Sequence, residues 1–483
     1  MSPTAPKAPL SIPTKLAYGA GDMGAGLTAN LVVFSFLIFL TNVAGLSPAL
    51  AGTVLLLGKV WDSISDPMVG FLSDRTRSRW GRRHVWMLFG SVPFGVSFAL
   101  MWIVPGFEQT WLKFAYYLVV SILFFTSYTA VNLPYAALTP ELTQDYDERT
   151  TLSSFRLAFS LGGAVSGLAL GAILSSLITN PQRQFQLLGL IGAIAAVLPL
   201  YWCIWGTRHR VQPQAALSTD QAADQAADQS ADQSTDKGAA PAAVAMPFWE
   251  QIPIAFQNRP FLFVIGIYLT SWLALQITAT IIPFYAVSWI GLESYFLVAL
   301  AVQGTAIPML FVCSLISRRL GKRGLYFLGM GSWIIIQIGL MLVQPGQVGL
   351  LYGLAIAASF GVATAYVVPW SMLPDVIELD ELQTGQRREG VFYSFMTLLQ
   401  KVGLAVGIFL VGQALELAGF IPATPGEPIP VQPESALFAI RAAIGPFPTL
   451  CLILGLVLAY FYPLTREVHE EIMLKLRERK AAE

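Results

Sequence analysis

Charge is scarce in this chain. Only 12% of its 483 residues are Asp, Glu, Lys or Arg, whereas a soluble globular domain averages about 25%. Hydrophobic residues make up 55% of the sequence, and the mean hydropathy is +0.61. This composition excludes an ordinary soluble domain and predicts an integral membrane protein.

Other shortages narrow the functional classes. The net charge is +0, which gives no electrostatic basis for nucleic-acid binding. The three cysteines, Cys203, Cys313 and Cys451, lie in apolar runs without the spacing of a metal site or a disulfide framework. The sequence shows no phosphate-cradling loop and no nucleophile with a base partner. We therefore expect neither a transport ATPase nor an enzyme, and we expect no cofactor.

Long apolar runs are what the chain has instead. A membrane-spanning helix needs about 20 mostly apolar residues. The sequence therefore predicts an all-α membrane protein with twelve spanning helices, at residues 16–40, 48–72, 85–104, 112–138, 153–177, 187–206, 260–287, 294–316, 325–343, 348–373, 390–416 and 436–462.

The basic residues of the loops predict the orientation. They fall on one side of the predicted spans, in the loops after spans 2, 8 and 10 and in the C-terminal tail. The loop after span 2 alone carries Arg75, Arg77, Arg79, Arg82 and Arg83. Because loops rich in Lys and Arg stay in the cytoplasm, we expect both termini to be cytoplasmic, in a plasma (inner) membrane.

The chain is predicted to consist of two halves. A repeat of Ala, Asp and Gln fills residues 219–245 and is typical of a flexible linker. We predict a six-helix half at 1–206, a cytoplasmic linker at 207–250, a second six-helix half at 251–464 and a cytoplasmic tail at 465–483. The motif "RWGRR" has a counterpart in "RLGKR" in the second half. Parallel halves of six helices are the layout of major facilitator transporters, whose substrate site lies between the halves.

Two carboxylates within span 2 predict an ion site. A charge at a helix centre costs about 2.5–3.5 kcal/mol on insertion scales and usually marks a pathway. Asp62 and Asp66 are four residues apart and share one helix face. They repel each other unless a cation lies between them, and Ser65 could add a hydroxyl ligand. We expect a sodium or proton site. The alternative is a Lys59–Asp62 pair with Asp66 in contact with solvent.

Lys401 is a second charge that needs an explanation. It lies within the apolar segment "FYSFMTLLQKVGLAVGIFL", too far from either end to reach water easily. We expect it to meet a carboxylate across the interface between the halves. It is either a structural salt bridge or a lysine that pairs with the aspartates when the cation site is empty. Asp22, in "YGAGDMGAG", either faces the cavity or caps a neighbouring backbone.

Charges also cluster at the predicted cytoplasmic ends of both halves. The segment "TPELTQDYDERT" follows span 4, and an acidic run after span 10 is the matching feature of the second half. These clusters are either solvated loops or a gate that closes between the halves. The gate candidates are Arg75, Arg79, Arg83, Glu141, Arg149, Asp375 and Arg388.

Several motifs together resemble one transporter family. "WDSISDPMVGFLSDRTRSRWGRR", "KLAYGAGDMG", "YTAVNLPYAALTPEL", "RLAFSLGG" and "REGVFYSFMTLLQK" are similar to the glycoside–pentoside–hexuronide:cation symporters, the melibiose permease group. The resemblance implies an alternating-access symporter driven by sodium, with lithium or protons as alternatives, and a sugar or glycoside as its solute.

The resemblance also implies roles for single residues. Asp62 and Asp66 match the family's cation-binding aspartates, Thr129 matches the threonine that completes that site, and Lys401 matches the lysine that faces it. Ser65 and Lys59 stand where melibiose permease has asparagine and arginine. Lys59 and Lys401 are therefore expected to couple the ion to the solute, with Na+ bound at Asp62 and Asp66. Arg156 matches a sugar-proximal arginine.

The sequence departs from the family at the positions that contact the sugar. The sugar-gripping aspartates of spans 1 and 4 fall on Gly26 and Asn132, and the tryptophan beneath the sugar falls on Ala136, beside Tyr135. Sugar recognition needs directional acceptors for hydroxyls and an aromatic face for the ring. Both are weakened here, so coupling to a cation is predicted more firmly than a galactoside substrate.

A second resemblance favours another solute. "VVPWSMLPDVIE" and "LPYAALT" look closer to the sodium-dependent lysophosphatidylcholine symporters of the same family, which implies a lysolipid or another amphiphile. An uncoupled facilitator or a membrane receptor is the alternative from another class. Besides the solute and the cation, we expect membrane lipid as the surroundings and a monomer as the active form. The substrate-binding candidates are Asp22, Gly26, Asn132, Tyr135, Arg156, Tyr366 and Trp370.

Overall fold

The regular structure of the chain is helical throughout the described residues. The computed structural model describes residues 10–76, 78, 80–143, 145–210, 256, 258–385, 388–424, 430–464 and 466–482. The elements are α1 (Ile12–Ala20), α2 (Met23–Leu31), η1 (Val32–Phe36), α3 (Leu37–Asn42), α4 (Pro48–Arg75), α5 (Arg82–Met101), α6 (Thr110–Ala136), α7 (Thr139–Leu142), α8 (Tyr146–Leu177), α9 (Pro181–Thr207), α12 (Arg259–Phe284), η3 (Tyr285–Trp289), α13 (Phe296–Leu342), α14 (Val348–Thr384), α15 (Glu389–Leu417), α16 (Glu434–Ile444), α17 (Pro446–Phe461) and α18 (Arg466–Ala482).

Length, composition and exposure identify a multi-pass membrane protein. Ten helical stretches within the described residues are long and apolar enough to cross a membrane. The charged helix α4 is not one of them, and α13 covers two of the predicted spans. Phe89, Phe311 and Ile335 are each 71% exposed, which suits a lipid-facing surface. The exact count of twelve crossings stays a prediction.

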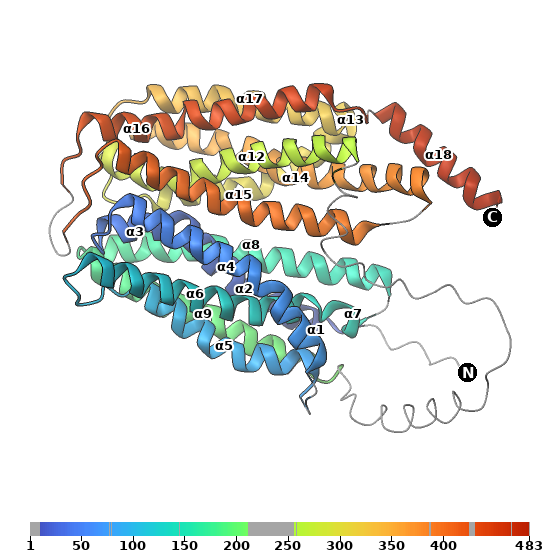
Figure 1. The fold of residues 1–483 in the computed structure, drawn as a ribbon, viewed down its shortest axis with the longest axis horizontal. Coiled ribbons are helices and arrows are strands. Elements are labelled where there is room, and N and C mark those ends of the chain that lie inside the picture. Colours follow the sequence, from blue (N-terminus) through green and yellow to red (C-terminus); the bar gives the residue numbers. More distant parts are fainter. Residues whose placement is uncertain are drawn as a thin grey trace.

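The helices form two bundles that lie side by side (Figure 1). In the first half, from α1 to α9, α2 packs on α8, and α5 packs on α6 and α9. In the second half, from α12 to α17, α13 packs on α14, and α12 packs on α15 and α17. This is the predicted major facilitator arrangement. The predicted linker lies outside the described residues beyond Arg210, so the domain limits stay predictions.

The backbone repeats features between the halves. Gly81 of "RWGRR" has φ 91°, and Gly321 of "RLGKR" has φ 74°. Glycine adopts such positive φ values at no steric cost, so both motifs make a turn at the same position. At Gly321 the long α13 divides into the predicted spans 8 and 9. A π-helix also lies in the first apolar stretch of each half: η1 within Ile12–Asn42, and η3 at the end of Arg259–Trp289.

Two predicted boundaries differ from the structure. The predicted span at 436–462 is broken into α16 and α17 at Gly445, whose φ is −110° and ψ is −87°. The predicted loop after span 4 is partly helical, because α7 lies within it and α8 begins at Tyr146. Asp145 caps α8: its Oδ1 accepts a hydrogen bond of 2.9 Å from the Glu148 amide. Because a polar residue caps it, α8 begins before the apolar run that predicted span 5.

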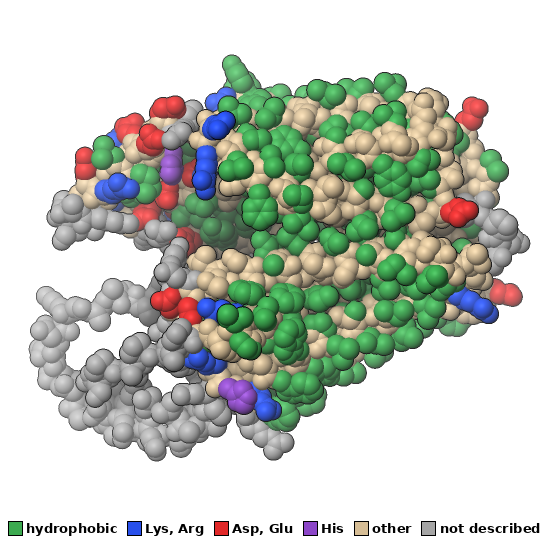
Figure 2. Space-filling model, turned by 180° about the vertical axis from the view of Figure 1, so that it is seen from behind, with side chains coloured by type: hydrophobic (Ala, Val, Ile, Leu, Met, Phe, Trp, Pro, Cys, Tyr) green, Lys and Arg blue, Asp and Glu red, His purple; other side chains and the backbone are tan. Residues whose placement is uncertain are grey.

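The halves meet at one end, which we call the outer end. Here α4 crosses α15 where Gly52 faces Gly412, and the Ala423 amide donates a hydrogen bond of 3.2 Å to the Thr41 carbonyl. The opposite, inner end carries the arginine-rich start of α5 and α18, and Figure 2 shows it hollowed between the halves. The structure is therefore closed at the outer end and open at the inner end, the one predicted to be cytoplasmic.

Candidate functional site

A central cavity of about 540 Å³ lies between the halves. Sites for small molecules typically measure about 300–1,000 Å³. The cavity is lined by residues of both halves, from α2, η1, α4, α6 and α8 and from α12, α13, α14 and α15. Among the described residues, its charged lining side chains are Lys59, Asp62, Asp66 and Lys401.

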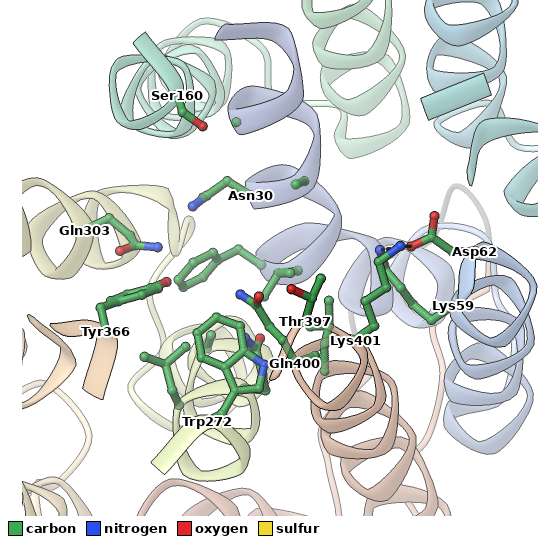
Figure 3. A pocket seen from close by; sticks show the side chains of 18 of the residues that line it. Asn30, Lys59, Asp62, Ser160, Trp272, Gln303, Tyr366, Thr397, Gln400 and Lys401 are labelled. Atoms are coloured by element: carbon green, nitrogen blue, oxygen red, sulfur yellow. Dashed lines mark hydrogen bonds and ion pairs between the residues drawn. The ribbon is translucent and has the colours of Figure 1, made fainter. Parts of the chain in front are cut away.

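The four charges form one cluster that joins the halves. Lys401 Nζ, from α15, lies 3.1 Å from Asp62 Oδ2 and 2.5 Å from Asp66 Oδ2, both on α4. Lys59 Nζ lies 3.3 Å from Asp62 Oδ2 and 4.2 Å from the ring centroid of Phe125. The side chain of Asp62 is only 1% exposed, and a buried charge requires such partners. Figure 3 shows Lys59, Asp62 and Lys401 together at one side of the cavity.

Thr129 adds a hydroxyl to this cluster. Its Oγ1, on α6, lies 2.9 Å from Asp62 Oδ1 and 3.0 Å from Asp66 Oδ1. Ser65 is buried as well, but its hydroxyl donates a hydrogen bond of 3.1 Å to the backbone carbonyl of Asp62. Asp62, Asp66 and Thr129 therefore present side-chain oxygens around one point, which is the ligand type that hard cations prefer.

Three predicted substrate residues lie in a cluster of their own. Arg156 Nε lies 3.2 Å from Asp22 Oδ2, and its guanidinium lies 5.2 Å from the ring centroid of Tyr135. Tyr135 is fully buried, and its hydroxyl donates a hydrogen bond of 2.8 Å to the Tyr18 carbonyl. Asp22, Tyr135 and Arg156 do not line the central cavity.

Most of the other predicted substrate residues do line the cavity. Gly26, Asn132 and Tyr366 line the cavity. Trp370 does not, and packs instead on Tyr268, with the ring centroids 5.9 Å apart. The substrate role of all these residues stays a prediction.

The packing of α2 explains why glycine occupies position 26. A Cβ atom there would overlap the backbone carbonyl of Ser160 on α8. Two further glycines, Gly24 of α2 and Gly163 of α8, likewise meet the backbone of a neighbouring helix. The aspartate that the melibiose permease group is expected to carry here would therefore have no room at position 26, because α2 and α8 approach too closely there.

We expect Gly26→Ala to destabilise the protein. The added methyl must push α2 from α8, and overpacking a close contact costs about 1–3 kcal/mol. Thermal unfolding of the purified protein measures the loss. Gly162→Ala is the matched control, because a Cβ at this exposed α8 position meets nothing within 4 Å. Equal melting temperatures for the two variants would contradict the packing argument.

The gate candidates of the first half lie at the inner end. Arg82 Nε lies 2.8 Å and Arg83 Nε 3.5 Å from Glu141 Oε1. Arg75 packs over the ring of Phe71 at 3.7 Å from its centroid. Arg149 Nε donates a hydrogen bond of 3.1 Å to the Thr143 carbonyl. Arg79 lies outside the described residues.

The gate candidates of the second half also have partners within their own half. Lys322 Nζ lies 2.7 Å from Asp375 Oδ1. Arg388 donates two hydrogen bonds to Asp380, of 2.9 and 2.6 Å. Contacts of this kind, together with the hollow between the halves at this end (Figure 2), belong to an open arrangement. A gating role stays a prediction.

Several residues of the cavity wall were not predicted from the sequence. Trp272 and Gln276 of α12, Asn30 of α2 and Gln303 of α13 all line the cavity. The available signal was a neutral amide within an apolar run, as in "SWLALQITATII" around Gln276. This signal is weaker than that of a charged residue within a span, because a neutral amide costs far less to bury than a charge.

Comparisons with known proteins agree with this fold. The model of the MFS/sugar transport protein family matches residues 17–466. The structure is similar to the nucleoside transporter NupG, at a TM-score of 0.61 and 12% identity over 93% of this chain and 100% of that chain. It is also similar to the xylose transporter XylE from Escherichia coli in an inward open conformation, at a TM-score of 0.60 and 12% identity over 95% and 98% of the chains.

Relatives in sequence cover nearly the whole chain. An uncharacterised symporter of Synechocystis is 46% identical over 98% of this chain and 97% of the relative. A protein of Escherichia coli named as a glycoside/cation symporter, YagG, is 28% identical over 98% and 96%. A protein of Danio rerio named sodium-dependent lysophosphatidylcholine symporter 1-A is 27% identical over 96% and 88%. The family match, the two bundles and the cavity between them lead to one conclusion: the chain belongs to the MFS/sugar transport protein family and is a multi-pass membrane transporter.

Proposed function

We propose that this transporter is a symporter of the glycoside–pentoside–hexuronide:cation type, that sodium is its coupling ion, and that its solute is a sugar or glycoside. The observation that carries the proposal is the position of Lys401. Its ammonium group lies between the carboxylates of Asp62 and Asp66 and comes from the opposite half of the molecule. A cation that binds these carboxylates must take the place of this lysine.

Lys401 lets the empty transporter return to the orientation in which it first binds ion and solute. A buried charge that loses its partner costs several kcal/mol, so two bare carboxylates would impede reorientation within the membrane. With Lys59 and Lys401 against Asp62 and Asp66, the cluster has two charges of each sign and stays neutral. The empty transporter can therefore change its facing direction without carrying a net charge at this cluster.

Sodium binding replaces Lys401 at the carboxylates and so favours the state that holds both ion and solute. The ion takes oxygens from Asp62, Asp66 and Thr129, and the Lys401 ammonium leaves them. The link between α4 and α15 at this point is then lost, and contacts of both halves with the solute replace it. Because coupling free energy is reciprocal, sodium raises solute affinity by the same factor by which the solute raises sodium affinity. A proton would need only one carboxylate, whereas three converging oxygens suit a metal cation.

A lysophospholipid is the second candidate solute. The relative from Danio rerio is named a sodium-dependent lysophosphatidylcholine symporter, and the cavity wall is largely apolar. The same ion site would serve either cargo, so the experiment must offer both.

Uptake into vesicles distinguishes these possibilities. The protein is reconstituted into sealed liposomes and offered a panel of labelled neutral mono- and disaccharides and labelled lysophosphatidylcholine. Each is tested with a sodium gradient alone, a pH gradient alone and no gradient. We expect accumulation above equilibrium of a saccharide with the sodium gradient alone. Accumulation with only the pH gradient would replace sodium by protons, and equilibration without accumulation under every gradient would establish an uncoupled facilitator.

A further inference from the structure

The cavity wall contains amide oxygens that lack partners. Asn30 Oδ1 of α2 and Gln276 Oε1 of α12 are buried, and neither has a hydrogen-bond partner among the described residues. Gln276 as a whole is only 3% exposed. The Oδ1 atom of Asn132, a residue already considered for the substrate, is buried and unpartnered in the same cavity. Buried acceptors normally find a donor, so these three oxygens indicate a ligand that brings several donors of its own.

A fixed aromatic ring lies beside them. Trp272 precedes Gln276 by one helical turn, so both side chains are on one face of α12. The indole Nε1 donates a hydrogen bond of 3.0 Å to the Gln400 carbonyl. The indole also meets the Tyr366 ring edge to face, with the centroids 5.6 Å apart and the planes at 79°. Figure 3 shows Trp272 between Tyr366 and Gln400. These contacts hold the ring in one orientation at the cavity wall.

We propose that α12 provides the main substrate contacts, with Trp272 as the platform for the apolar face of a sugar ring and with Gln276 and Asn30 as acceptors for its hydroxyl groups. This inference rests on the proposed function and specifies its solute. Asn30 belongs to the first half and Gln276 to the second, so one ring that contacts both residues holds the halves together.

The charges of the cavity favour a neutral ring over a phospholipid headgroup. The charged lining residues already pair with one another. Elsewhere the described wall offers amides, hydroxyls and aromatic rings. An amide both donates and accepts hydrogen bonds, as hydroxyl groups do. Without sodium, a phosphate brought into this part of the cavity would find no unpaired cation, which is unfavourable at a buried site. With sodium bound, the released Lys401 ammonium is a cation that lines the cavity, so the lysophosphatidylcholine arm of the test below decides between the two solutes.

The same tryptophan connects the substrate with the ion. Its hydrogen bond ends on the backbone of Gln400, the residue that precedes Lys401. When sodium displaces the Lys401 side chain, any shift of α15 at this point acts directly on the Trp272 ring. Trp272 is therefore expected to transmit coupling as well as to bind the substrate.

Thermal shifts of the purified protein test these contacts. The probes are the methyl pyranosides of glucose, galactose, mannose and xylose, with lysophosphatidylcholine as the charged arm, each titrated in sodium chloride and in choline chloride. We expect at least one methyl pyranoside to raise the melting temperature in sodium. Gln276→Leu and Trp272→Ala should each raise its half-maximal concentration by about tenfold or more, because one buried hydrogen bond or ring contact is lost.

Gln432→Leu is the control, since Gln432 is a buried amide that does not line the cavity and whose side chain hydrogen-bonds the backbone of Ile421 and Pro430. It should keep the wild-type half-maximal concentration. The shift caused by sodium alone should persist in all three variants, which separates this inference from the ion site. Loss of the sodium shift in the wild type would instead overturn the proposed function. Unchanged pyranoside binding in Gln276→Leu and Trp272→Ala, or stabilisation by lysophosphatidylcholine alone, would overturn the inference.

Trp272→Phe tests the link to the ion. It keeps an aromatic face and removes the donor to Gln400. We expect pyranoside binding to survive, while the ratio of affinities in sodium and in choline falls toward one. An unchanged ratio would show that the Trp272–Gln400 bond does not transmit coupling.

Discussion

Asp62→Asn and Asp66→Asn are expected to abolish accumulation of the solute driven by sodium. Each change removes one of two carboxylates that would hold the ion and leaves Lys59 and Lys401 against a single negative charge. Because ion affinity depends on the number of charged ligands, loss of one of the two carboxylates should lower the affinity for sodium by about 100-fold or more, which is about 2.7 kcal/mol. Uptake into liposomes with a sodium gradient measures the effect.

The two variants should differ in stability. Asp62 is 1% exposed and contacts both lysines, whereas Asp66 is 31% exposed and contacts Lys401. Asp62→Asn therefore leaves Lys59 without this carboxylate partner in a buried place, while after Asp66→Asn both lysines still contact Asp62. Thermal unfolding should therefore show the greater loss for Asp62→Asn. The double variant Lys59→Gln/Asp62→Asn restores neutrality and should recover stability without recovering accumulation. Full concentrative uptake by both single variants would refute the ion site.

Gly412→Leu is expected to prevent the outer end from closing. A Cβ at this position would lie 2.5 Å from the Pro48 carbonyl oxygen and 3.1 Å from the Gly52 Cα, both in the opposite half. Overpacking costs about 1–3 kcal/mol, and this cost falls only on the state in which α4 and α15 touch. The equilibrium should shift away from the state that is closed at the outer end by about 5- to 160-fold, and transport should decline with it.

Spin labels at the inner end can measure this shift. Leu72 of α4 and Leu320 of α13 are 51% and 57% exposed and lie on different halves. The distance between labels at these positions should shorten in Gly412→Leu as the inner end closes. Gly353→Leu is the control, because this exposed glycine of α14 has nothing within 4 Å of its Cβ position. Identical distance distributions for the two variants would contradict the role of the crossing.

The fold and the proposed ion site are both predictable from the sequence for one physical reason. A charge within an apolar helix is costly enough to stand out, so Asp62, Asp66 and Lys401 are recognisable from the sequence alone. The structure places Lys401 within 3.1 Å of Asp62, although 339 positions separate the two numbers in the chain. The apolar runs likewise predicted most helices, because lipid leaves backbone polar groups no alternative to helical hydrogen bonds.

The proposed solute contacts could not be predicted in the same way. Neutral amides such as Gln276 and Asn30 cost far less in a membrane helix than charges, and they occur in spans without any function. A binding role is indicated only because these amides line the same cavity, and this depends on how α2 and α12 pack. Asp22 and Arg156 show the reverse case, because they stand out in the sequence yet pair with each other outside the cavity lining.

The π-helices make the first long helix of each half tolerant of a change in length. Each of η1 and η3 is a five-residue segment wound more widely than an α-helical turn, and a turn of this kind contains surplus backbone. Losing one residue there would let the chain relax into ordinary helix, with α2 and α3 near their places around η1 and with α12 unmoved before η3. The same loss in the middle of α6 would rotate everything beyond it by about 100°. Homologues that differ by a single residue should therefore carry the difference at 32–36 or 285–289.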